Sequence, residues 1–215
     1  MPDAAIARHP QAVLLPRLVV VLLLSLLAAC GGVRPEPEVV SRAAYANGGE
    51  SSVTLLTVVN SRTGAGDHAA LLIAGSQRVI YDPAGSFLIP QAPRYRDVVY
   101  GVSPGVETVY LGYHARATHH VIAQTLPLTV AAADAAIAAA EARGRAGPGL
   151  CAVSSAAVLR DIPGLERLPG SYFPVRLSES FGAVPGVETR TVVMEDIPPA
   201  ARTAEPGTMA LRPAG

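Results

Sequence analysis

The chain has few cysteines, no lysine and no excess charge of either sign. Its 215 residues include two cysteines, and 17 basic residues balance 17 acidic ones, so the formal net charge is zero. The basic residues are all arginines, and they do not cluster. A neutral chain of this kind has no electrostatic basis for binding nucleic acid or for docking a polybasic patch on a membrane. We therefore expect no nucleic-acid partner.

Long hydrophobic runs are also missing. The most apolar segment, residues 18–27, is ten residues long, whereas a helix needs about 20 apolar residues to cross a bilayer. It follows Arg8 and Arg17 and leads into Ala28-Ala29-Cys30. A positive start, a short apolar run and small residues before a cysteine resemble a bacterial lipoprotein signal peptide. This resemblance implies that residues 1–29 are removed and that Cys30 receives lipid.

The lipidated cysteine would tether the mature chain to a membrane of the cell envelope. Several acyl chains anchor a protein stably, whereas one alone binds reversibly. Gly31 follows Cys30, and no aspartate there signals retention at the inner membrane. We expect the periplasmic side of the outer membrane. Removal of residues 1–29, which include Arg8, Arg17 and Asp3, leaves 186 residues with 15 basic and 16 acidic side chains. This length is enough for one domain, and its charge is close to neutral.

The remaining sequence predicts an α+β domain followed by a tail. Residues 30–50 are expected to be a flexible linker, 51–197 the domain, and 198–215 a disordered tail rich in proline, alanine and glycine. Alternating and β-branched patterns predict an antiparallel sheet of about five strands, at residues 53–60, 68–74, 78–81, 97–102 and 106–113. Helices are expected at 131–143, capped by Thr129, at 151–159 and at 173–181, with a last strand at 188–194.

Cys151 is left without an intramolecular partner once Cys30 carries lipid. A free thiol in an exported protein is either buried and inert or reactive. Cys151 opens a predicted helix directly after Gly147-Pro148-Gly149, where the helix dipole and free backbone N–H groups stabilise a thiolate. It is therefore a candidate nucleophile. The alternative is a cysteine that packs as a small apolar residue in the core, which would show the same sequence pattern.

A nucleophilic cysteine needs a base and a group that orients the base. His68 begins an otherwise apolar strand, and Tyr81 and Asp82 end the next one. Strand alternation allows only one of these two residues to face the histidine. Asp82 is the better candidate by charge and Tyr81 is the alternative, while an aspartate before proline also suits a turn.

These residues resemble the NlpC-type papain-like hydrolases. The match rests on His68-Ala69-Ala70-Leu71-Leu72-Ile73, a glycine turn, Val79-Ile80-Tyr81-Asp82, and a later helix that begins with Cys151. The order histidine, orienting residue, cysteine is similar to the circularly permuted branch, which includes the lecithin:retinol acyltransferase-like proteins. The resemblance implies a papain-like fold and a Cys151–His68–Asp82 triad, which is recognised by geometry and not by chain order.

Two functions follow from this pattern. One is a membrane-anchored cysteine hydrolase or acyltransferase that cleaves amide or ester bonds of the envelope, with peptidoglycan peptides favoured as substrate. The other is a non-catalytic envelope lipoprotein that uses the same scaffold for binding or assembly.

No metal or cofactor is predicted. His119 and His120 are adjacent on a strand and would point to opposite faces, and neither they nor His114 has a partner at ligand spacing. Gly64-Ala65-Gly66 is too short for a phosphate-binding loop.

Overall fold

The computed structural model describes residues 37–202, which form an α+β fold around a seven-stranded antiparallel sheet. The strand order is β4-β5-β3-β2-β1-β6-β7. The strands are β1 (Ser52–Asn60), β2 (Gly66–Ala74), β3 (Arg78–Tyr81), β4 (Arg94–Tyr95), β5 (Val98–Val99), β6 (His119–Pro127) and β7 (Glu188–Val192). The helices of this part are α2 (Pro37–Ala43), α3 (Pro104–His114), α4 (Val130–Arg143), α5 (Cys151–Arg160), α6 (Pro174–Gly182), α7 (Pro199–Arg202) and a short 3₁₀ turn, η2 (Met194–Asp196).

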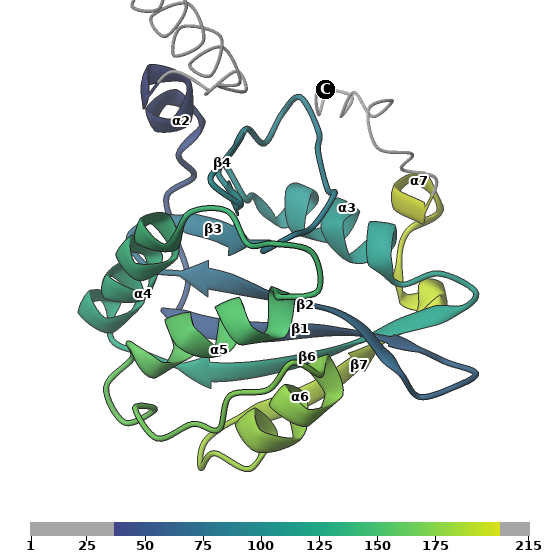
Figure 1. Cartoon of the computed structure of the whole chain (residues 1–215). Coiled ribbons are helices and arrows are strands. Elements are labelled where there is room, and N and C mark those ends of the chain that lie inside the picture. Colours follow the sequence, from purple (N-terminus) through teal and green to yellow (C-terminus); the bar gives the residue numbers. More distant parts are fainter. Residues whose placement is uncertain (1–36, 203–215) are drawn as a thin grey trace, which may run out of the picture. The chain divides into compact units, whose positions relative to one another are not determined.

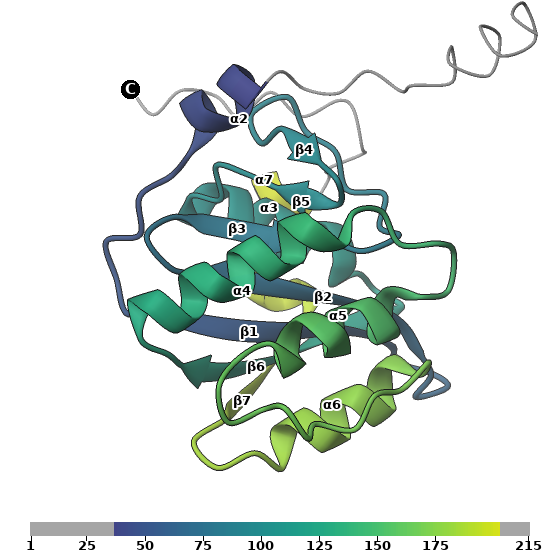
Figure 2. The ribbon, with the colours of Figure 1, turned by 60° about the vertical axis from the view of Figure 1, so that its left-hand side comes forward.

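The sheet is covered on both faces (Figures 1 and 2). Side chains of β2 alternate between two cores: Leu71 and Ile73 pack with α4, α5 and α6, whereas Ala70 and Leu72 pack with α3 and α7. This explains why β1 and β2 are apolar almost throughout, since a strand buried on both faces has no solvent side. The two faces also decide which side chains at the strand ends meet.

The first three predicted strands and the predicted helices of the second half are confirmed. The hairpin β2–β3 pairs Leu71 with Tyr81 and Ala74 with Arg78. The alanine-rich helix α4 begins after Thr129, whose hydroxyl accepts the backbone N–H of Ala132 at 3.2 Å. Helices α5 and α6 and strand β7 lie at the predicted places within a residue or two.

The predicted strand at residues 106–113 is wrong, because this segment is helix α3. Val106, Val109 and Tyr110 are buried at helical spacing. The hydroxyl of Ser103 caps the helix by accepting the Val106 N–H at 3.3 Å, and Pro104 occupies the first turn. The valine, threonine and tyrosine content suggested a strand, but the cap and the buried stripe decide the conformation.

The count of about five strands was also too low. The predicted strand at residues 97–102 shrinks to β5, which has two residues, and β4 forms beside it. Strand β6 contains His119 and His120, which were expected on a strand but were not counted in the predicted sheet; it pairs with β1 over nine residues, from Ser52 with Pro127 to Asn60 with His119. Its histidines, glutamine and threonine hid the strand pattern.

The structure describes one end of the predicted linker and one end of the predicted tail, and both contain a short helix. Residues 37–43 form α2, and the Arg78 N–H donates to the Tyr45 carbonyl at 3.0 Å, so this end of the linker packs on the domain. Residues 199–202 form α7, where Ala201 is buried. The predicted signal peptide, Cys30 and residues 203–215 lie outside the described residues. Between residues 37 and 202, no helix has the length and apolarity to cross a membrane.

Candidate active site

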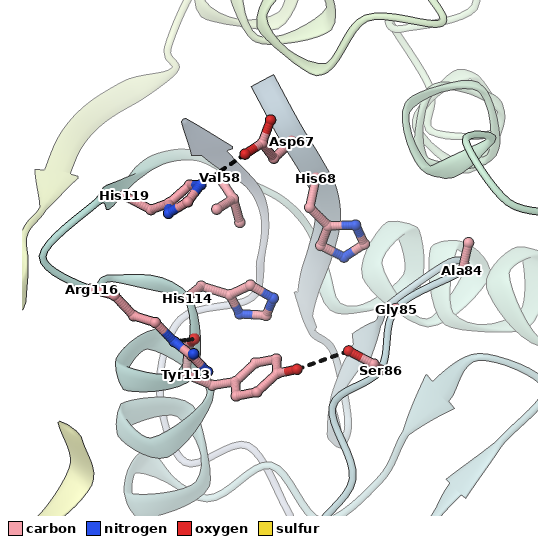
Figure 3. Close-up of a pocket in the computed structure, with 10 residues that line it drawn as sticks. All are labelled: Val58, Asp67, His68, Ala84, Gly85, Ser86, Tyr113, His114, Arg116 and His119. Carbon is pink, nitrogen blue, oxygen red and sulfur yellow. Dashed lines mark hydrogen bonds and ion pairs between the residues drawn. The ribbon is translucent and has the colours of Figure 1, made fainter. Parts of the chain in front are cut away.

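His68 sits at an irregular point of β2. Val58 of β1 pairs with His68 and Val59 pairs with Gly66, so Asp67 is the extra residue of a β-bulge. A bulge bends the strand and redirects the side chains beside it. His68 shares the sheet face of Ala70 and Leu72, and its ring lies against α3 (Figure 3).

Asp82, and not Tyr81, meets the histidine. The last pair of the hairpin joins Leu71 to Tyr81, so Asp82 lies one position further on, on the face of His68 and diagonally across from it. Asp82 Oδ1 is 2.7 Å from His68 Nε2. Tyr81 packs into the opposite core and interacts with Ser154 of α5. Of the two alternatives left open by the sequence, the structure therefore brings Asp82 to the ring.

The carboxylate of Asp82 is completely buried and has several donors. The Tyr110 hydroxyl donates to Oδ1 at 2.8 Å, and Arg94 donates to Oδ2 at 3.0 Å and to the Asp82 carbonyl at 2.7 Å. Burial alone would raise the pKa of this carboxyl, but the hydrogen bond and charge of His68 and the charge of Arg94 lower it. Asp82 is therefore an ionised, well-supported partner. Gly85 must lack a side chain, because a Cβ there would lie 2.0 Å from Asp82 Oδ2.

Arg94 also connects this carboxylate to the loop before α5. Its guanidinium donates to Asp97 Oδ1 at 2.9 Å. The other oxygen of Asp97 accepts the backbone N–H groups of Ala84 at 3.1 Å and Ala146 at 2.9 Å. The chain Asp82–Arg94–Asp97 thus fixes the segment that leads into Cys151 relative to the residue that holds His68.

Cys151 is the first residue of α5, as the sequence predicts, and its side chain is nearly buried, with 7% of the residue exposed. It hydrogen-bonds with the His68 ring and with the backbone of Ala69 and Ala152. Because Nε2 of His68 is engaged by Asp82, Nδ1 is the ring nitrogen left for the thiol. Leu150 provides no side-chain cap to α5, which leaves the first-turn N–H groups free to act on the sulfur.

These contacts favour an ion pair between the two side chains. Burial would raise the pKa of the Cys151 thiol, but the hydrogen bond and charge of His68 and the two backbone hydrogen bonds lower it. Burial would lower the pKa of His68, but the hydrogen bonds with Asp82 and Cys151 and their charges raise it to about 9. A lowered thiol pKa beside a raised imidazole pKa favours the thiolate–imidazolium pair over the neutral thiol and imidazole.

A second histidine, His114 at the end of α3, stacks on His68. The ring centroids are 5.6 Å apart and the planes differ by 9°. His114 Nδ1 donates to the Tyr110 carbonyl at 3.0 Å. Burial, followed by the positive charge of His68, lowers the pKa of His114 to about 4. His114 is thus neutral at neutral pH.

The two histidines and Asp82 also carry the donor atoms of a metal site. The nearest donors of His68, Asp82 and His114 lie within 4.8 Å of one another, and two histidines with one carboxylate suit a transition metal. Asp82 Oδ1 already accepts from His68 and Tyr110, however, and Oδ2 from Arg94. A cation would have to displace these bonds beside a guanidinium, so the arrangement is suited to proton transfer.

A cavity of about 350 Å³ opens beside the two histidines (Figure 3). His68 and His114 form one part of its wall, and side chains from the ends of α3 and β6 form another. The complete lining is Val58, Asp67, His68, Ala84, Gly85, Ser86, Tyr113, His114, Arg116 and His119. His68, which hydrogen-bonds the Cys151 thiol, is thus also a wall residue of the cavity.

Sequence reasoning missed the residues around Asp82. Tyr110 was placed on a strand, and a helical reading of the buried residues of α3 would have pointed it inward. His114 was considered only as a metal ligand. Nothing in the sequence signals Arg94 or Asp97, because both act through contacts between distant segments.

Comparisons with protein-family models, with curated proteins and with solved structures find no match to this chain. The geometry of the site is therefore the basis for a functional proposal.

The neutral state of His114 predicts acid sensitivity. The pKa of His114 is about 4 in the folded chain and 6.5 in the unfolded chain. Between pH 6.5 and about pH 4 the imidazole therefore takes up a proton only when the chain is unfolded. The free energy of unfolding falls as the pH drops through this range. The loss reaches up to about 3 kcal/mol. In urea unfolding at about pH 7 and about pH 4.5, His114→Gln should lose less stability than the unmodified chain. An equal loss in both would mean that His114 takes up its proton in the folded state.

Proposed function

We propose that this chain is a cysteine hydrolase or acyltransferase of the cell envelope. Cys151 is the nucleophile, His68 moves the proton, and Asp82 orients the imidazole. The observation that carries the proposal is the hydrogen-bonded series Cys151–His68–Asp82, in which a thiol at a helix start and a buried carboxylate hold opposite sides of one ring. A cysteine with a purely structural role does not require a neighbouring base, or a carboxylate that orients that base.

The reaction follows from the ion pair. The Cys151 thiolate attacks the carbonyl carbon of an amide or ester, and backbone N–H groups in the first turn of α5 would stabilise the oxyanion. The C–N or C–O bond breaks, and the His68 imidazolium gives its proton to the departing amine or alcohol. His68 then takes a proton from water or from another acceptor, which attacks the thioester and releases the acyl group.

The finer fold assignment is part of the same proposal. Strand β2 begins near the histidine, β3 leads into the orienting residue, and α5 begins with the cysteine. This order supports a permuted NlpC-type papain-like domain of the lecithin:retinol acyltransferase-like branch. The sheet has seven strands where about five were expected, with β4 and β7 at its two edges.

The proposed location and substrate depend on the N-terminal sequence. The run that ends in Ala28-Ala29-Cys30 supports export and lipid anchoring, and Gly31 supports sorting to the outer membrane, facing the periplasm. The bonds within reach of such an enzyme are amides and esters of the envelope. Peptidoglycan stem peptides are favoured, ahead of lipids and acylated proteins, because of this location.

One observation favours the second function, a non-catalytic lipoprotein that uses the scaffold for binding or assembly. Cys151 is only 7% exposed, and free cysteines are often small apolar residues in a core. The two proposals differ in whether Cys151 forms a covalent intermediate.

Trapping the acyl-enzyme separates them. The purified chain is mixed in turn with a stem peptide, a phospholipid and an acylated peptide, and the adduct is located by mass spectrometry and peptide mapping. We expect an acyl group on Cys151 with one of these classes, removed by hydroxylamine and absent from Cys151→Ala. Product formation that continues in Cys151→Ala would rule out the nucleophile, and the absence of both adduct and product would favour the binding protein.

A further inference from the structure

Arg116 forms part of the cavity wall and is held in a defined position there. Its Nε–H donates to the Tyr113 carbonyl at 2.6 Å. Its guanidinium also lies over the Tyr113 ring, with the central carbon 4.8 Å from the ring centroid. Two contacts with one neighbour fix the plane of the guanidinium, so less side-chain freedom is lost when a ligand binds.

The outer nitrogens of this guanidinium are unused. Among the residues that the structure describes, no acceptor bonds to either Nη of Arg116, and no carboxylate forms an ion pair with it. The acidic residue of the cavity wall, Asp67, pairs with another wall residue and not with Arg116: its Oδ2 lies 2.7 Å from His119 Nε2. A fixed, exposed arginine fork therefore faces the cavity, and no carboxylate of the described residues is paired with it.

The other polar groups of the wall do not pair with the outer nitrogens of Arg116 either. The Tyr113 hydroxyl pairs with Ser86 at 2.8 Å, at the far end of the ring over which Arg116 lies (Figure 3). His114 is neutral. His68 shares its charge with Asp82 and Cys151 on the other sides of its ring. A ligand that enters the cavity would meet the guanidinium of Arg116 with no carboxylate paired to it among the described residues.

The position of the cavity relative to His68 indicates which part of a substrate enters. In the proposed reaction His68 passes its proton to the departing amine or alcohol, so the leaving group must lie on the side of this ring. His68 lines the cavity, whose volume of about 350 Å³ is at the small end for ligand sites. It suits a group of about the size of one or two amino-acid residues.

We infer that this cavity is the leaving-group subsite and that it selects an amine or alcohol carrying a carboxylate, which Arg116 binds through its two free nitrogens. The planar fork of arginine matches a planar carboxylate with two parallel hydrogen bonds. The inference rests on the proposed function, because the leaving group is placed beside His68 on the ground that His68 donates the proton to it. Within that function, it narrows the substrates to those with an acid group close to the scissile bond.

A matched pair of probes tests the inference. Bromoacetyl-alanine and bromoacetyl-alaninamide carry the same electrophile for Cys151 and differ in a carboxylate against a carboxamide. The measured quantity is the ratio of the two alkylation rates in each variant, which cancels changes in thiol reactivity. We expect the carboxylate probe to react faster in the unmodified chain, and Arg116→Gln to lower the ratio by about tenfold. Bromoacetyl-aminomethylphosphonate, used in parallel, tests whether a tetrahedral anion is accepted equally well.

Arg176→Gln is the matched control. Arg176 lies on α6, is exposed, pairs with Glu179 at 2.9 Å and does not line this cavity, so its loss removes the same charge elsewhere. A ratio that stays high in Arg116→Gln, or falls equally in Arg176→Gln, overturns the subsite, as does a preference for the phosphonate over the carboxylate. If neither probe labels Cys151 in the folded chain, the proposed function itself is wrong. This outcome differs from a labelled Cys151 with an unchanged rate ratio, in which the subsite alone is wrong.

Discussion

His68→Ala should slow alkylation of Cys151 by neutral iodoacetamide about a hundredfold at neutral pH. The hydrogen bond and charge of His68 are the main influences that lower the pKa of the thiol, and they oppose burial, which raises it. Without the imidazole, burial dominates and the thiolate becomes a small fraction. Each unit of pKa increase removes about nine-tenths of the reactive form when the pKa lies above the working pH. The rate is followed by mass spectrometry of the folded chain.

His120→Ala is the control for this substitution. His120 adjoins His119 on β6, but it bonds to Ser61 at 2.9 Å and does not line the cavity. Its loss should leave the rate within about twofold, as expected for a position outside the site. Equal rates in His68→Ala and the unmodified chain, or labelling that needs denaturant in both, would remove the nucleophile from the proposal.

Asp82→Ala should cause the largest loss of stability of any single change at the site, about 3–5 kcal/mol in urea unfolding. The carboxylate is 0% exposed, and its removal takes the acceptor from the Tyr110 hydroxyl and from His68 and one of two carboxylate partners from the half-buried Arg94 guanidinium. Breaking a buried ion pair by removing one partner costs this much because the other charge stays buried. Asp67→Ala, which removes the exposed partner of His119, should cost less than about 1 kcal/mol.

The substitution Asp82→Asn separates the effect of Asp82 on the His68 imidazole from its contribution to the stability of the fold. An amide oxygen still accepts a hydrogen bond, so the variant should fold, but the negative charge that helps to raise the pKa of His68 is gone. The histidine then loses its proton at a lower pH, and the Cys151 thiolate loses its partner. Alkylation at neutral pH should fall at least tenfold. An unchanged pH profile would show that Asp82 supports the fold alone.

The elements with strong local signals were predictable from the sequence. Strand β1 and the hairpin β2–β3 have β-branched runs separated by glycine turns, and α4 combines alanine with a threonine cap. Helix α3 was not predictable in the same way, because its valines and tyrosines prefer strands and only packing against β6 and α7 shows their helical spacing. Strand β6 was hidden because its polar side chains face partners from other segments, such as Ser178 for Gln124 at 2.9 Å.

The same division applies to the site. His68, Asp82 and Cys151 each stand at the end of an element, where a lone polar side chain is conspicuous in a sequence. The choice between Tyr81 and Asp82 depended on which face of β3 meets α3, and this needs the three-dimensional packing. Arg94 is the clearest case of a residue beyond prediction, since its role depends on its contacts with the carboxylates of Asp82 and Asp97, which only the folded structure shows.

The most direct test of the account is a pH titration of the ultraviolet absorbance of the thiolate, taken as the difference between the unmodified chain and Cys151→Ser. We expect a thiolate signal already present at neutral pH, with a midpoint below the ordinary cysteine value of about 8.5, and a midpoint above that value in His68→Ala. A signal that first appears above the ordinary value in the unmodified chain would contradict the ion pair on which the proposed chemistry depends.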